Sequence, residues 1–214
     1  MQAIYDSPWH NPALFYLAGG IFLVVLARRL PFLIGFLVLF TVEILADATV
    51  TGGWSPAAGT PALQPLAIAF VILGDYRYLV LVERYRRPGG GARPFWIALG
   101  FSLVVPIASQ LVLRVLPRGD SRVTFLVYEV LFLLLSLVVL GTLRRRVTAS
   151  PEIARWLREL SVFEVGQYAL WALADVVILA GAPVGHLLRL VPNVLYYACF
   201  LPFVLARAPA EARS

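Results

Sequence analysis

The feature that most constrains the fold is a series of long apolar stretches separated by short segments rich in Arg, Pro or Gly. A helix needs about 20 residues to cross the hydrocarbon core of a bilayer. Charged residues make up only 14% of the chain, whereas they make up roughly 25% of soluble domains. The sequence therefore predicts an all-α integral membrane protein, a seven-transmembrane-helix bundle in one domain (residues 1–214), with spans over residues 12–27, 30–50, 65–82, 94–113, 123–143, 160–180 and 187–206.

The distribution of arginine predicts the orientation of these spans. Most arginines outside the spans follow the first, third, fifth and seventh spans, and only Arg114, Arg118, Arg122 and Arg189 fall on the opposite side. Loops rich in Arg or Lys stay in the cytoplasm. We therefore expect the amino terminus outside and the carboxyl terminus inside, in the plasma (inner) membrane of a bacterium.

The segment before the sixth span has the residue types of a helix start. Ser150 suits an N-cap, and Pro151 suits the first helical position. The segment 152–159 then either lies along the cytoplasmic membrane surface or extends the sixth span directly.

Several kinds of site are excluded by what the sequence lacks. All eighteen basic residues are Arg, so no Lys is present to form a Schiff base with retinal or pyridoxal phosphate. The chain has one cysteine, Cys199, and no Gly-x-Ser-x-Gly or His-Glu-x-x-His motif. The net charge of +6 comes from arginines beside apolar spans, which is the pattern of topology signals and not of a nucleic-acid interface. We expect no cofactor and no nucleic-acid partner, and the missing motifs favour a role that is not enzymatic.

An internal repeat is suggested by two similar segments in spans that run in the same direction. Leu45-Ala46-Asp47 is followed by Gly52, and Leu173-Ala174-Asp175 is followed by Gly181. Two parallel three-helix units joined by one helix would produce this pattern, and some small transporters are built in this way. The alternative is a chance recurrence in a chain rich in Leu and Ala.

Acidic residues inside the predicted spans are the main candidates for function. A charge at the centre of a bilayer costs about 2.5–3.5 kcal/mol on insertion scales, so such residues are usually paired, hydrated or functional. We expect no basic residue beside these acids, so that at least one acid holds a proton or the group binds a cation. The predicted binding residues are Glu43, Asp47, Asp75, Glu129 and Asp175, with Asn193, Tyr196 and Tyr197.

Arg77 lies inside the third span and needs a partner, because its guanidinium stays charged. Glu164 lies at a similar predicted depth, so we expect an Arg77–Glu164 ion pair that is either static or opens as a gate. Asp75 is the alternative partner if the helix is locally distorted, because residues two apart do not face each other. A structural alternative covers all the acids, in which each one is hydrogen-bonded singly to a neighbouring Thr, Tyr or backbone group.

These features favour a small transporter or channel with an outward-facing buried acidic site for a proton or small cation. A second hypothesis is a membrane sensor or an accessory subunit of a larger complex. A third is a metal-dependent lipid-modifying enzyme, with Glu43, Asp47, Asp75 and Asp175 as metal ligands. The expected partners are the lipid bilayer, a proton or small cation, and other membrane subunits or further copies of the chain.

Overall fold

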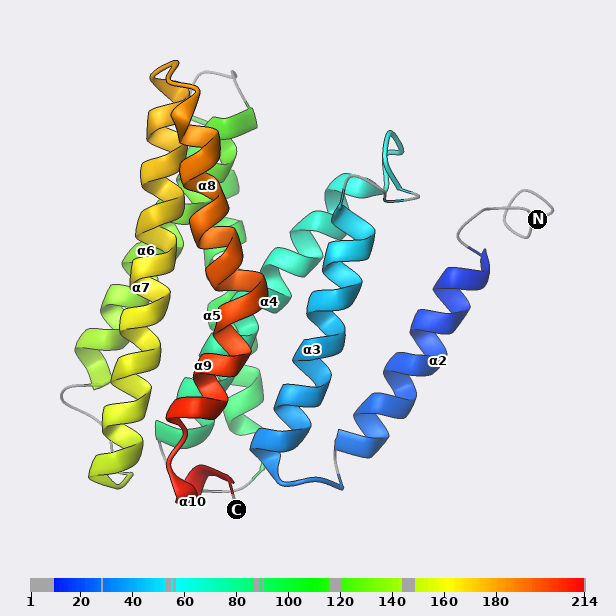
Figure 1. Cartoon of the computed structure of the whole chain (residues 1–214), viewed down its shortest axis with the longest axis vertical. Coiled ribbons are helices and arrows are strands. Elements are labelled where there is room, and N and C mark those ends of the chain that lie inside the picture. The colour runs from blue at the N-terminus through cyan, green and yellow to red at the C-terminus, as the bar shows by residue number, and fades with distance from the viewer. Residues whose placement is uncertain are drawn as a thin grey trace. The chain divides into compact units, whose positions relative to one another are not determined.

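A computed structural model describes residues 10–27, 29–52, 55, 57–86, 89, 91–115, 121–143 and 149–213. Every regular element within these ranges is a helix (Figure 1). The helices are α2 (His10–Ala27), α3 (Phe32–Thr51), α4 (Leu63–Arg86), α5 (Arg93–Leu113), α6 (Ser121–Leu143), α7 (Pro151–Leu179), α8 (Val184–Val194), the π-helical turn η1 (Leu195–Cys199), α9 (Phe200–Arg207) and α10 (Ala210–Arg213).

Six helical segments among the described residues are long and apolar enough to cross a membrane. They correspond to the second to seventh predicted spans, with α8, η1 and α9 forming one continuous span over Val184–Arg207. The chain is therefore a multi-pass helical membrane protein. In α2 the apolar part, Leu17–Leu26, is shorter. The first predicted span (residues 12–27), and with it the seven-helix bundle, the orientation and the internal repeat stay predictions.

The chain forms two compact units, which are described separately. The first comprises residues 1–73 and 210–214, and in it α3 packs against α2 and α10. The second comprises residues 74–209. In this second unit α7 packs between α6 and α8, and α5 packs against α6 (Figure 1).

The predicted start of the sixth span is confirmed. The Ser150 hydroxyl accepts a hydrogen bond from the Ile153 backbone N–H at 3.2 Å, and Pro151 is the first helical residue. The helix then runs without interruption to Leu179. The segment 152–159 therefore extends the span, and it does not form a separate surface helix.

Candidate functional site

A row of buried polar side chains runs along α7 in the second unit. We call it the α7 polar face and define it as Ser161, Glu164, Gln167, Tyr168 and Asp175. Spacings of three, four and seven residues bring these side chains to one side of the helix. Each is at most 4% exposed. Because polar groups are costly to bury in an apolar bundle, each one needs a hydrogen-bond or charge partner, or has a function.

At the middle of the row, three helices meet around one carboxylate. Asp75 of α4 is 1% exposed and accepts hydrogen bonds from the hydroxyls of Tyr128 of α6 and Tyr168 of α7, one on each carboxylate oxygen. Phe132, which is fully buried, packs against the Tyr168 ring with centroids 4.4 Å apart. The carboxylate is thus held in an apolar environment by two groups that can both donate and accept a proton.

Toward the carboxyl end of α7, two acids share two arginines. The Arg189 guanidinium pairs with Asp175 and also lies 3.1 Å from Glu129 Oε1. Arg122 Nη1 lies 3.5 Å from Asp175 Oδ1. The expectation that no basic residue accompanies the buried acids is therefore wrong at this point. From the sequence both arginines were interpreted only as orientation signals, but Arg122 lies in the first turn of α6 and Arg189 in the second turn of α8, where their long side chains reach the acids.

Arg77 is fully buried and is held by a local change in helix geometry. The Phe200 N–H bonds to the Leu195 carbonyl five residues earlier, whereas an α-helix would direct it to Tyr196. The Tyr196 carbonyl instead accepts a hydrogen bond from Arg77 Nη2 at 2.9 Å. The Arg77 guanidinium also lies 4.0 Å from the centre of the Tyr196 ring and 4.6 Å from that of Phe200, which adds cation–π attraction.

Glu164 lies on α7 between Tyr168 of the Asp75 cluster and Ser161, on the side of that cluster away from Asp175. Its carboxylate is 2% exposed and interacts electrostatically with both Arg77 and Asp75. Arg77 also donates a hydrogen bond to the Tyr196 carbonyl, and the predicted Arg77–Glu164 ion pair stays a prediction. One turn nearer the amino end of α7, Ser161 Oγ accepts a hydrogen bond from the Tyr78 hydroxyl at 2.8 Å.

The remaining predicted residues lie in different surroundings. Asn193 Oδ1 accepts a hydrogen bond from Trp171 Nε1 at 2.8 Å, and the Tyr196 ring packs against that indole. Tyr197 is 39% exposed. In the first unit, Asp47 accepts a hydrogen bond from Thr51 at 2.8 Å, which agrees with the structural alternative for this residue. Glu43 is half-buried on the same helix, α3.

Several contributors were not predicted as binding residues from the sequence: Tyr78, Tyr128, Ser161, Gln167, Tyr168, Arg122 and Arg189. Gln167 is fully buried, and neither polar atom of its amide has a hydrogen-bond partner among the described residues. A glutamine inside a predicted membrane span could by itself have indicated a polar site. The two arginines could have been found by testing whether arginines near a helix start reach an acid on a neighbouring helix.

In the part of the chain that the structure describes, no three His, Cys, Asp or Glu side chains are grouped as metal ligands. The metal-dependent hypothesis therefore gains no support from these residues. Comparison of the chain with known protein families, with curated proteins and with solved structures gives no match.

Proposed function

We propose that the protein is a small transporter or channel that moves a proton or a small cation along the α7 polar face. The observation that carries this proposal is the succession of buried polar groups along one helix. From one end to the other they are Asp175 with Glu129 and Arg189, the Asp75–Tyr128–Tyr168 cluster, Glu164 with Gln167, and Ser161 with Tyr78.

The chemistry of these groups suits proton movement in particular. Carboxyl and hydroxyl groups both give and accept a proton, and they make up most of the row. Asp75 touches two hydroxyls on opposite helices and interacts electrostatically with Glu164, so it connects the two halves of the row. At the Asp175 end the arginines balance the two acids, which lowers the cost of keeping these acids ionised in the membrane.

A small cation is the second form of the same proposal. The Gln167 amide is fully buried, and a buried polar group without a hydrogen-bond partner costs about 1–3 kcal/mol. Its oxygen, together with the Glu164 carboxylate one turn away, offers the oxygen ligands that hard cations prefer. We expect such a cation to bind where Glu164 supplies the charge.

The proposal is tested by measuring flux into proteoliposomes that contain a pH-sensitive dye, with a potassium diffusion potential as driving force. Asp75→Asn keeps the size of the side chain but removes its ability to release a proton. We expect this change to reduce protein-dependent proton flux by about 10²-fold or more, the scale on which positioned acid–base groups act. Glu211→Gln, at an exposed acid of α10, is the control and should leave the flux unchanged.

Two results would count against the proposal. Equal proton flux in the wild type and in Asp75→Asn would remove the central carboxylate from the path. A wild type that moves neither protons, sodium nor potassium under any gradient would contradict transport altogether.

A second candidate is a membrane sensor or accessory subunit. The ion pairs that Asp175 and Glu129 make with arginines favour it. Both acids already have these partners within the fold, so their role is complete without a moving ion. This candidate predicts a stable association with another membrane subunit or with further copies of the chain. The mass of the protein extracted in mild detergent measures that association.

A further inference from the structure

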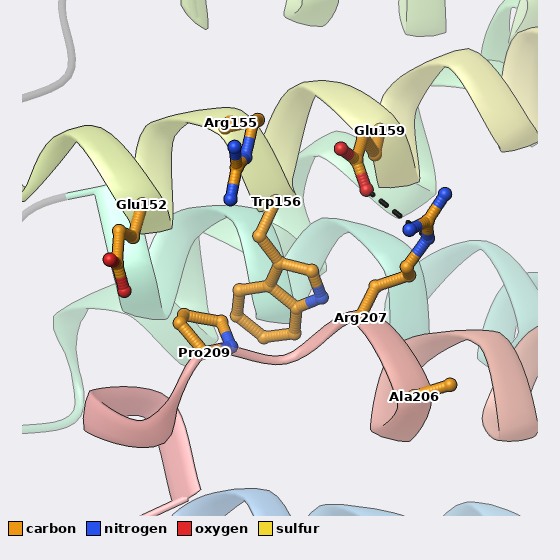
Figure 2. A pocket seen from close by; sticks show the side chains of 7 residues that line it. All are labelled: Glu152, Arg155, Trp156, Glu159, Ala206, Arg207 and Pro209. Atoms are coloured by element: carbon orange, nitrogen blue, oxygen red, sulfur yellow. Dashed lines mark ion pairs between the residues drawn. The ribbon is translucent and has the colours of Figure 1, made fainter.

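A pocket of about 350 Å³ lies where the amino end of α7 meets the end of α9 (Figure 2). From α7 it is lined by Glu152, Arg155, Trp156 and Glu159, and from the other side by Ala206, Arg207 and Pro209. In Figure 2 Glu152 and Arg155 extend from α7 toward the segment that follows α9, Glu159 extends toward Arg207, and the Trp156 ring lies between them. The pocket belongs wholly to the second unit and is distinct from the α7 polar face.

Three polar groups of this pocket are not used in polar contacts within the described part of the chain. Trp156 is 2% exposed, and its Nε1 has no hydrogen-bond partner among the described residues. In Figure 2 this nitrogen lies on the Arg207 side of the pocket. Arg155 and Glu152 extend into the pocket from neighbouring turns of α7, and in the described part of the chain neither belongs to an ion pair, whereas Glu159 and Arg207 pair at 3.4 Å. The pocket therefore offers one buried N–H donor, one cation and one anion to a ligand.

An apolar groove adjoins the pocket and shares Arg155 and Glu159 with it. Its other lining residues are Arg158, Val162, Phe163 and Phe203. The two phenylalanine rings stack with centroids 4.9 Å apart, and Val162 is 58% exposed. One candidate span begins at Pro151 and another ends at Arg207, so pocket and groove lie at one membrane boundary. A polar pocket that continues into an apolar groove at this level matches an amphiphile.

We propose that this pocket and groove bind a phospholipid whose headgroup carries both a phosphate and an ammonium group. Arg155 and the Trp156 N–H bind the phosphate, because both are donors and one is charged. Glu152 binds the ammonium. Val162, Phe163 and Phe203 contact the first part of an acyl chain. A headgroup without a cation would leave Glu152 without an ammonium partner, and a soluble phosphate would leave the groove uncovered.

The test is native mass spectrometry of the full chain, extracted in detergent and titrated with single lipids. Phosphatidylethanolamine is expected to bind more tightly than phosphatidylglycerol and than soluble phosphoethanolamine. Arg155→Gln should weaken phosphatidylethanolamine binding about tenfold, because a charge-assisted hydrogen bond is lost. Val162→Ser, at an exposed position of the groove, should weaken it too, while leaving soluble phosphoethanolamine unaffected.

Arg93→Gln is the matched control, since Arg93 is an exposed arginine at the start of α5 and outside the pocket. Binding that is equal in the wild type and Arg155→Gln would overturn the proposal, as would a loss of the same size in Arg93→Gln. Tighter binding of phosphatidylglycerol would contradict the pairing of the ammonium group with Glu152. Binding of soluble phosphoethanolamine as tight as that of the lipid would contradict the role of the groove. None of these outcomes depends on ion flux.

Discussion

Replacing Arg189 by Gln should destabilise the second unit more than any loss of a surface charge. The guanidinium pairs with Asp175, which is fully buried, and with Glu129, which is 5% exposed. Removing one partner of a buried ion pair costs about 3–5 kcal/mol, because the other charge stays buried without compensation. Arg122 remains 3.5 Å from Asp175 and offsets part of the loss, so we expect about 3 kcal/mol, at the low end of that range.

The assay is equilibrium unfolding in mixed micelles, followed by circular dichroism. The double variant Arg189→Gln/Asp175→Asn should recover part of the stability, since the pair is then neutral on both sides.

Arg207→Gln is the matched control for this prediction. Arg207 is 59% exposed and pairs with Glu159 at 3.4 Å, and an exposed pair of this kind contributes about 0–1 kcal/mol. A loss of stability in Arg189→Gln no larger than that in Arg207→Gln would refute the assignment of a buried charge network to this end of α7.

Two further predictions concern local packing and are read from the same unfolding curves. A Cβ added at Gly74 would lie 2.7 Å from Cζ of Tyr196, so Gly74→Ala should destabilise by about 1–3 kcal/mol, as overpacking does. At Gly166 an added Cβ would meet nothing within 4 Å, so Gly166→Ala should leave stability unchanged or raise it by up to about 1 kcal/mol. Equal effects at both glycines would argue against the close contact between Gly74 and Tyr196. Ser150→Ala removes the cap on the Ile153 N–H and should cost about 1 kcal/mol; no loss would show that α7 starts without it.

The helices could be predicted from the sequence because hydrophobicity alone requires them. The span expected over residues 94–113 is found as Arg93–Leu113, and that over 123–143 as Ser121–Leu143. The third helix was predicted too short, at residues 65–82, because the charges that follow end the apolar run. The helix itself continues to Arg86, and Glu83 and Arg86 pair at 2.9 Å along its last turn. Helical hydrogen bonds do not depend on whether a side chain is charged.

The arrangement of the site was less predictable, because it depends on how each helix is rotated about its axis. The sequence identified Asp75, Glu164 and Asp175 as buried acids, but it did not show that Tyr128 and Tyr168 would converge on Asp75. It also did not predict the π-helical turn after Pro192, which frees the Tyr196 carbonyl for Arg77. In a π-helical turn the backbone N–H bonds to the carbonyl five residues earlier, in place of four, and the amino-acid composition gives no sign of this shift.

The most direct test of the central claim is a pH-difference infrared spectrum of the protein in lipid. If buried carboxyl groups carry the proton, the wild type should show a carbonyl band of a protonated carboxylic acid that changes with pH, and Asp75→Asn or Glu164→Gln should lose part of it. A wild-type spectrum that both variants reproduce would contradict proton transfer along the α7 polar face.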